Sequence, residues 1–111
     1  MNIDLSILIP TYNRAKYIDK LLEYFVDEIY QFDFTYEILI SDNHSIDNTR
    51  QVIESYKDKL EFEVFHQKSN IEEKSILYLI SIAKGDYLVY LGDDDRVDFE
   101  LLNVALKKIK S

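Results

Sequence analysis

Three consecutive aspartates, Asp93, Asp94 and Asp95, are the residues of this sequence whose types most directly suggest chemistry. They follow Gly92 and the apolar run 87–91, which is too short to span a membrane and is typical of a buried strand. Adjacent carboxylates repel one another, so a fold that gathers them at a strand end either binds a cation there or leaves them in solvent. The segment therefore has two interpretations, a metal site and a polar turn.

Two other polar segments also follow apolar runs. The run 5–9 leads into residues 10–14, and the run 36–40 leads into residues 41–49. In a parallel sheet the carboxyl ends of the strands meet at one edge, where ligands bind. We therefore expect both segments and residues 92–96 to converge on one cleft, which favours the metal site over the polar turn.

Strand patterns alternate with helix patterns along the whole chain. Strands are predicted over 5–9, 36–40, 61–65 and 87–91. Apolar residues at helical spacing form four stripes: Ile18, Leu21, Leu22, Phe25, Val26 and Ile29; Val52, Ile53 and Tyr56; Ile76, Leu79, Ile80 and Ala83; and Leu102, Ala105, Leu106 and Ile109. Pro10 is expected to end the first strand, Gly85 to cap the third helix, and Asp98 to precede the last helix. This alternation predicts an α/β fold with a parallel sheet covered by helices on both faces.

Composition limits the number of domains, the partners and the chemistry that the chain can have. The 111 residues suit one small domain, and 21 acidic against 13 basic residues give a formal net charge of −8. Because the chain is acidic and its basic residues are scattered, we do not expect nucleic acid or anionic membranes to be direct partners. The chain has no cysteine, which rules out disulfides and thiol chemistry. No signal pattern or spanning run is present, and we expect a soluble, cytoplasmic protein. A full-length form that is peripheral at the inner face of the membrane stays an open alternative.

Three motifs in order resemble those of the family 2 GT-A glycosyltransferases. Residues 10–14, Pro-Thr-Tyr-Asn-Arg, resemble the first motif, and residues 85–95 resemble the third, which carries the metal-binding Asp-x-Asp. The second motif is matched at Asp42, Ser45, Asp47 and Thr49. Each motif alone is a weak signal of the family. The three in order, with strands and helices between them, are a strong signal, and the resemblance covers almost the entire chain.

The resemblance implies a fold and a function. The fold would be a Rossmann-like (GT-A) three-layer α/β/α arrangement with a mainly parallel sheet in the strand order 3-2-1-4. Residues 1–111 would form a single domain that binds a nucleotide-diphosphate sugar for inverting transfer to an acceptor such as a growing cell-surface glycan or a lipid-linked acceptor. The acceptor site and the general base of the family lie in a second half, so we expect a fragment of a longer enzyme that binds but does not transfer.

The resemblance also implies site residues. A divalent cation, Mg²⁺ or Mn²⁺, would stabilise the diphosphate as a Lewis acid. Asp94 is the first choice as its ligand, Asp95 is either a second ligand or a cleft residue, and Asp93 is expected to reach the ribose or to assist. The nucleotide-binding residues would be Pro10, Thr11, Tyr12, Arg14, Asp42, Asn43 and Asp93. No catalytic base is expected within this chain.

The chain departs from the family pattern in two places. Asn43 stands where the family commonly has a second aspartate, and an amide can donate or accept, so uracil, thymine and cytosine all remain open and the donor could be linked to UDP, dTDP or CDP. The family's Asn-x-Gly segment appears as residues 70–72, with Glu72 in place of glycine. His44 is expected to be an exposed loop residue, and His66 a structural residue without an identifiable partner.

The sequence also allows other functions. The main alternative is a stand-alone acidic metal- or nucleotide-binding regulatory module, such as a receiver domain, but a receiver would place paired acids after its first strand, where this chain has Pro-Thr-Tyr. A nucleotidyltransferase would have a glycine-rich loop there, and the chain has two glycines in all. In the order 3-2-1-4 the strand over 87–91 is an edge strand of the sheet. Its outer edge would have no partner strand, which predicts that the isolated chain self-associates.

Overall fold

The computed structural model describes residues 2–111, which form a four-stranded parallel sheet in the order β3-β2-β1-β4. The elements in chain order are β1 (Ile3–Thr11), α1 (Ala15–Glu28), the short 3-10 helix η1 (Ile29–Gln31), β2 (Tyr36–Asp42), α2 (Thr49–Glu54), β3 (Glu63–His66), α3 (Lys74–Ile82), β4 (Gly85–Tyr90) and α4 (Phe99–Lys110). The predicted three-layer α/β/α fold and the strand order are both confirmed. No helix within residues 2–111 combines the length and the apolar character that crossing a bilayer requires.

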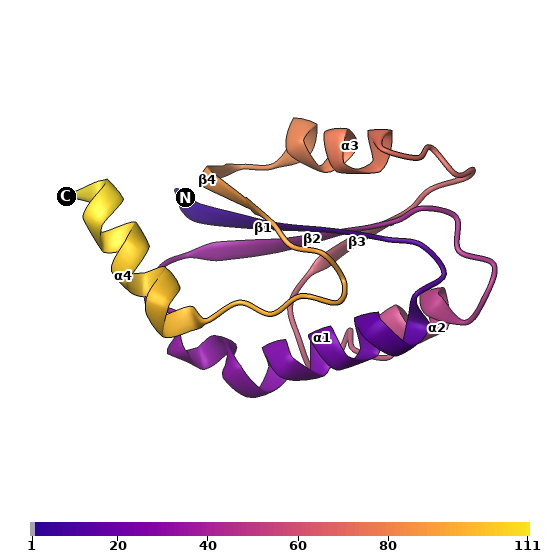
Figure 1. The fold of residues 1–111 in the computed structure, drawn as a ribbon, viewed down its shortest axis with the longest axis horizontal. Helices are drawn as coiled ribbons and strands as arrows, with labels where there is room; N and C mark the ends of the chain where they lie inside the picture. Colours follow the sequence, from indigo (N-terminus) through magenta and orange to yellow (C-terminus); the bar gives the residue numbers. More distant parts are fainter. Residues whose placement is uncertain (1) are drawn as a thin grey trace.

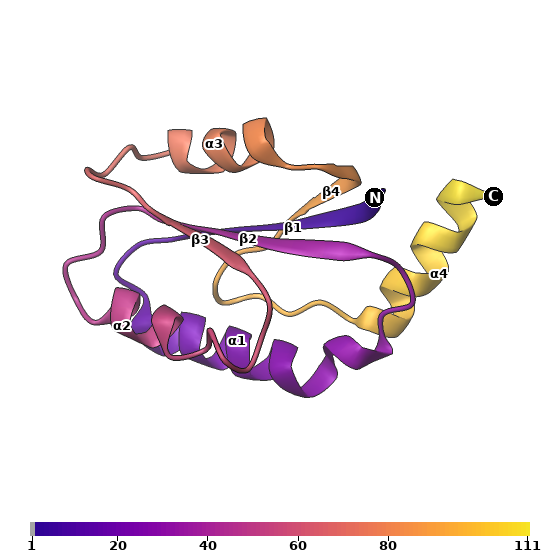
Figure 2. The ribbon, with the colours of Figure 1, turned by 180° about the vertical axis from the view of Figure 1, so that it is seen from behind.

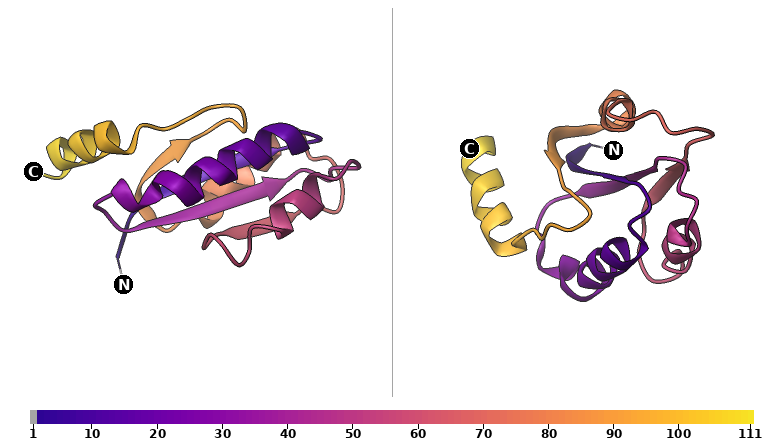
Figure 3. Two further views of the ribbon diagram at one scale, coloured as in Figure 1. Left: turned by 90° about the horizontal axis from the view of Figure 1, so that it is seen from below. Right: turned by 45° about the vertical axis from the view of Figure 1, so that its right-hand side comes forward.

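The helices cover the two faces of the sheet unequally. Helix α3 lies alone on one face, and α1 and α2 lie side by side on the other (Figures 1 and 2). Helix α4 stands near the amino ends of the strands (Figure 1), and Lys110 Nζ at its end is 2.8 Å from Asp4 Oδ1 in β1. The loop that joins β4 to α4 passes over the edge of the sheet (Figure 3).

The main core lies between the sheet and α1. Every second residue of β1 and β2 points toward this helix, whose buried residues are Ile18, Leu21, Leu22 and Phe25. The Phe99 ring packs against the Phe25 ring, with centroids 5.8 Å apart, and fixes the start of α4 on the core. The predicted stripe of α4 is partly wrong, because Leu106 is buried whereas Ile109 is 56% exposed.

Strand β1 continues through Pro10, which was predicted to end it. Backbone groups of alternate residues face the same edge of a strand, so Pro10 faces the same edge as Leu8. Leu8 O accepts a hydrogen bond from Leu91 N at 2.9 Å, and the pairing of β1 with β4 ends at Leu8 and Tyr90. Because no partner strand lies opposite Pro10 on that edge, its missing N–H costs no ladder hydrogen bond.

Gly85 does not cap α3 as predicted. The helix ends at Ile82, and Gly85 begins β4 without a positive φ. A Cβ atom at this position would lie 2.6 Å from Ser6 N in the neighbouring strand β1. The glycine is therefore explained by a close approach of two backbones rather than by a left-handed turn.

Strand β4 is buried on one face only. Tyr87 and Val89 pack against the main core, whereas Leu88 is 45% exposed and Tyr90 is 63% exposed. The apolar run predicted a strand buried on both faces, but α3 covers the neighbouring Leu8 and Leu39 instead. One long edge of β4 also has no partner strand within residues 2–111.

Candidate functional site

A cavity of about 390 Å³ opens at the carboxyl ends of β1, β2 and β4. It is lined by Pro10, Thr11, Tyr12, Arg14, Asn43, Glu72, Ser75, Tyr90, Gly92, Asp93 and Asp94. All three polar segments singled out in the sequence contribute to it. Because β1 lies between β2 and β4, the loop 10–14 separates Asn43 from the two aspartates.

Asp93 is the buried carboxylate of this cavity, with 8% of the residue exposed. Burial raises the pKa of its carboxyl group, and this effect outweighs the hydrogen bond from Thr11 and the nearby charge of Arg14, which act in the opposite direction. Thr11 Oγ1 donates to Asp93 Oδ2 at 2.8 Å and joins β1 to the loop after β4. The negative charge of Asp93 is thus only partly compensated.

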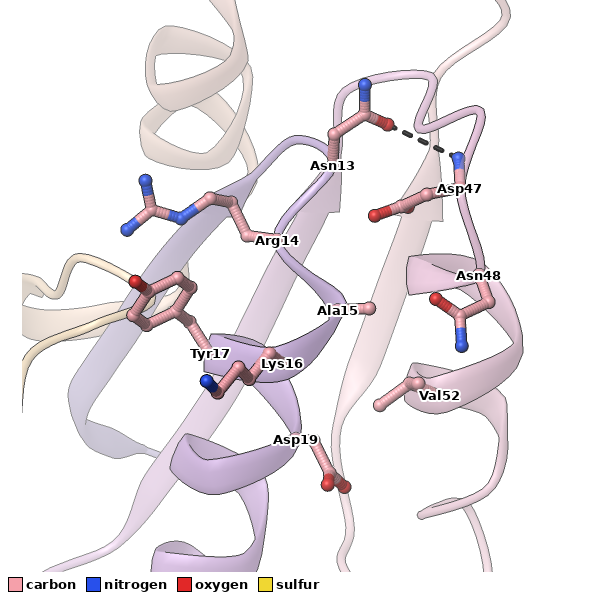
Figure 4. Close-up of a pocket in the computed structure, with 9 residues that line it drawn as sticks. All are labelled: Asn13, Arg14, Ala15, Lys16, Tyr17, Asp19, Asp47, Asn48 and Val52. Atoms are coloured by element: carbon pink, nitrogen blue, oxygen red, sulfur yellow. Dashed lines mark hydrogen bonds between the residues drawn. The ribbon is translucent and has the colours of Figure 1, made fainter.

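Arg14 supplies the positive charge closest to the aspartates. Its Nη2 lies 3.3 Å from Asp94 Oδ2, and its Nε lies 3.5 Å from Asp93 Oδ1. The buried Nε has no hydrogen-bond partner within residues 2–111, so the contact with Asp93 is an ion pair without a hydrogen bond. The guanidinium carbon lies 4.2 Å from the centre of the Tyr17 ring, and the side chain extends away from α2 (Figure 4).

Asp95 differs from its two neighbours. Its Oδ2 accepts a hydrogen bond from Gly92 N at 3.1 Å, and its own N–H donates to Gly92 O at 3.0 Å. The side chain closes the turn 92–95 and is not among the residues that line the cavity. The structure therefore brings Asp93 and Asp94 to the cavity and uses Asp95 to shape the turn that holds them.

Asp42 lies behind the cavity, with 2% of the residue exposed. Its Oδ1 accepts from Ser45 N at 3.1 Å, and its Oδ2 lies 2.7 Å from His66 Nδ1. The other ring nitrogen of His66 is 3.0 Å from Glu54 Oε2 in α2. His66 thus has two partners that the sequence did not reveal, and Asp42 fixes the shape of the loop after β2.

The loops after β1 and β2 are hydrogen-bonded into one unit. Asn13 N donates to Ser45 Oγ at 2.9 Å, Asn13 Oδ1 accepts from Ile46 N at 2.8 Å, and Arg14 N donates to Thr49 Oγ1 at 3.1 Å. A second hollow, of about 480 Å³, lies beside these bonds, between the first turns of α1 and α2 (Figure 4). Arg14 borders both hollows, but the two cavity aspartates lie only on the first.

The Asn43 amide is engaged by the segment before α3. Its Nδ2 donates to Asn70 Oδ1 at 2.8 Å, and its Oδ1 accepts from Ile71 N at 2.7 Å. The next residue, Glu72, has a φ of 52°, a left-handed backbone conformation that residues other than glycine seldom adopt. Asn43 therefore lines the cavity while both ends of its amide hold the 70–72 turn.

Comparison with known proteins identifies this architecture. The model of the family described as Glycosyl transferase family 2 matches residues 6–111. The chain belongs to this family. The abequosyltransferase RfbV of Salmonella typhimurium is 33% identical over 94 residues, which are 82% of this chain and 28% of RfbV.

Solved structures of glycosyltransferases share the fold. Staphylococcus aureus TarS, a poly(ribitol-phosphate) beta-N-acetylglucosaminyltransferase, has a 1–349 fragment that superposes with a TM-score of 0.82 at 29% identity, over 97% of this chain and 32% of that chain. The same fragment was crystallised with UDP-GlcNAc and with UDP. A mannosyltransferase from Pyrobaculum calidifontis shares the fold, with a TM-score of 0.78 at 21% identity. The chain thus spans about a third or less of the length of each of these three proteins.

Glu72, Ser75 and Tyr90 also line the cavity, although the sequence motifs did not assign them to the site. Of these three, Glu72 had a signal in the sequence. Its signal was the departure at 70–72, where the family pattern has glycine. The structure accounts for that pattern, since the third residue of the turn has a positive φ, which glycine adopts at no steric cost.

We expect Glu72→Gly to stabilise this family 2 chain by about 1 kcal/mol, because it relieves a left-handed conformation that costs a side-chain-bearing residue about that much. The measurement is the free energy of unfolding from urea titration. Glu73→Gly is the matched control, because Glu73 has a φ of −63° and gains nothing from glycine. Equal effects of the two substitutions would contradict the interpretation of strain at Glu72.

Proposed function

We propose that this chain is the donor-binding part of a glycosyltransferase and holds a nucleotide-diphosphate sugar in the 390 Å³ cavity. The observation that carries the proposal is the grouping of Arg14, Asp93 and Asp94 at the carboxyl ends of the strands, beside Thr11 and Tyr12. The UDP-GlcNAc complex of TarS supports it, because that relative has the same fold at 29% identity.

We further propose that Asp93 and Asp94 hold a divalent cation, Mg²⁺ or Mn²⁺, with the diphosphate. The residues fit such an ion, because Asp93 is buried with its negative charge only partly compensated, and Asp94 beside it is half exposed. No group of three or more potential ligating side chains occurs within residues 2–111. Two carboxylates leave the remaining positions to water and phosphate oxygens, as Mg²⁺ usually requires. Bound there, the cation would stabilise the charge of the departing diphosphate as a Lewis acid.

Other residues of the chain position the two aspartates and contact the nucleotide. Thr11 holds Asp93 in position through its hydroxyl, and the turn closed by Asp95 orients Asp94. Arg14 provides a second positive charge within reach of the same carboxylates and can pair with phosphate oxygens. Tyr12, 41% exposed at the cavity, offers an aromatic face to the nucleoside.

For the whole enzyme, we propose inverting transfer of the sugar to a glycan or lipid-linked acceptor. The family resemblance supports inversion, with a general base and an acceptor site outside these residues. The names of RfbV and TarS, which describe transfer of abequose and of N-acetylglucosamine, support a sugar as the transferred group. The isolated chain is therefore expected to bind donor nucleotides without transferring sugar.

Calorimetry with UDP in the presence of Mn²⁺ tests this proposal. We expect binding that weakens at least about tenfold when EDTA is added, because the carboxylates and the diphosphate then repel each other without a bridging cation. Asp94→Ala should cause a similar loss, and dTDP and CDP should show the same dependence on the metal.

Asp86→Ala is the matched control, since Asp86 is an exposed aspartate at the opposite end of β4. Asp95→Asn separates the ligand assignments, because the amide oxygen can still accept from Gly92 N and keep the turn closed. A loss as large as that of Asp94→Ala would then make Asp95 a ligand. Unchanged UDP affinity in a folded Asp94→Ala chain would overturn the metal site, and absence of any nucleotide binding would overturn the proposed function.

The open edge of β4 leads to a separate proposal, that the isolated chain self-associates. The edge has no partner strand within residues 2–111, and the exposed Leu88 side chain adds apolar surface beside it. We expect sedimentation velocity to detect larger species at high salt than at low salt, because salt screens the repulsion between chains of net charge −8. Leu88→Lys should reduce this association, whereas a monomer under all salt conditions would rule it out.

A further inference from the structure

We propose that Glu72 reads the base of the donor, in place of Asn43, by accepting a hydrogen bond from the N3–H of uracil or thymine. This inference rests on the proposed function, because it assumes that a nucleotide occupies the 390 Å³ cavity. It concerns the side of the cavity formed by β2 and the segment before α3, opposite the aspartates that follow β4.

The polar groups on that side are mostly committed to the protein itself. Both ends of the Asn43 amide are hydrogen-bonded to the 70–72 turn. Ser75 Oγ donates to Ser41 Oγ at 2.6 Å. A base that displaced Asn43 from the turn would break two hydrogen bonds at a residue that is 7% exposed.

Glu72 differs from these residues. It lines the same cavity, is exposed, and its carboxylate has no hydrogen-bond or ion-pair partner within residues 2–111. Its backbone is held in place, since Glu72 N donates to Asn70 Oδ1 at 2.8 Å and Glu72 O lies 3.4 Å from Asn43 Nδ2. A strained residue that is fixed by its neighbours at a ligand cavity is typical of a functional position.

The strand order places Glu72 on the side of the cavity where the base would lie, away from the diphosphate. The loop of β1 separates the Asn43 side of the cavity from Asp93 and Asp94. A nucleotide whose diphosphate lies at the aspartates therefore extends past Tyr12 toward Glu72. A diphosphate would also be repelled by this carboxylate, whereas a base with an N–H donor is attracted by it.

The chemistry of the carboxylate predicts a preference among bases. An ionised carboxylate only accepts hydrogen bonds, so it matches the N3–H of uracil and thymine. Cytosine presents a lone pair at N3, which the carboxylate would repel. Glutamine keeps the length of the side chain but can also donate, so it should tolerate cytosine.

The experiment measures the affinities of UDP and CDP by calorimetry with Mn²⁺ for the wild-type chain, Glu72→Gln and Glu72→Gly. We expect the wild type to prefer UDP and the ratio of the two affinities to fall about tenfold in both variants, as loss of one hydrogen bond to a charged group predicts. Glu73→Gln is the matched control, because Glu73 does not line this cavity, and it should keep the wild-type ratio.

An unchanged ratio in Glu72→Gln, with UDP still bound in a metal-dependent manner, would overturn the role of Glu72 and leave the proposed function standing. A wild-type preference for CDP would also overturn it. If the wild-type chain bound no nucleoside diphosphate, both this inference and the proposed function would fail. The two failures are therefore distinguishable from one data set.

Discussion

An Asp93→Asn chain is expected to unfold at a higher temperature than the wild type at neutral pH while binding UDP with Mn²⁺ at least about tenfold more weakly. Burial raises the pKa of Asp93, so keeping this carboxyl group ionised costs the folded state free energy. Asparagine removes that cost, and its oxygen can still accept from Thr11. It also removes a negative ligand from the site.

The gain in stability of Asp93→Asn over the wild type should depend on pH. The pKa of Asp93 is 3.8 in the unfolded reference and higher in the folded chain, so the wild type loses stability as the pH rises from about 3.8 through the folded pKa. The difference in melting temperature between Asp93→Asn and the wild type should therefore be small below this window, widen across it and then stay constant. Asp86→Asn, at an exposed position, is the matched control and should change the melting temperature little. A constant difference across the window would contradict the prediction.

Gly85→Ala is expected to cause the largest loss of stability, about 2 kcal/mol or more. The added Cβ would lie 2.6 Å from Ser6 N and 2.8 Å from Leu5 C, and both are backbone atoms at the centre of the sheet. Relief requires a shift of β4 away from β1, which would also lengthen the bond from Gly85 N to Ser6 Oγ, now 2.8 Å. Urea unfolding measures the loss.

The other glycine of the chain is the control for this substitution. In Gly92→Ala the added Cβ would meet Asp95 Oδ2 at 2.8 Å, which is the end of a flexible side chain. That side chain can rotate away, so we expect a much smaller change in the free energy of unfolding. Similar losses in the two variants would show that backbone contact at Gly85 is not the cause.

The sequence predicted the fold well because its signals were periodic and repeated. The stripe of α1 through Ile18, Leu22 and Phe25 is buried as predicted, and Asp98 caps α4 by accepting from Leu101 N at 3.1 Å. Gly85 was misassigned because a glycine after a helix suits both a cap and a close contact, and only the neighbouring strand distinguishes them. Which face of β4 is covered depends likewise on where α3 packs, which no local pattern encodes.

The site was predictable in location but not in all its contacts. The motifs brought Thr11, Arg14 and Asp93 to one cavity as expected. The partners of Asn43 and His66 are 27 or 28 and 12 or 24 residues away in the sequence, so residue types alone could not reveal them. The assignment of Asp42, Asn43, Asp94 and Asp95 to ligand atoms remains a prediction that the binding experiments address.

The early departure of β4 from the sheet has a consequence for hydrogen exchange. Strand β1 is paired on both edges from Leu5 to Leu8 but only with β2 from Ile9 to Thr11. Separating residues 91–97 from the cavity edge therefore breaks few backbone hydrogen bonds and leaves the doubly paired part of β1 intact. Amides of residues 91–97 should exchange through local opening, whereas those of residues 6–8 should exchange only through global unfolding. A nucleotide that contacts both β1 and the aspartate turn would slow exchange in the first group and make the cavity edge part of the cooperative core.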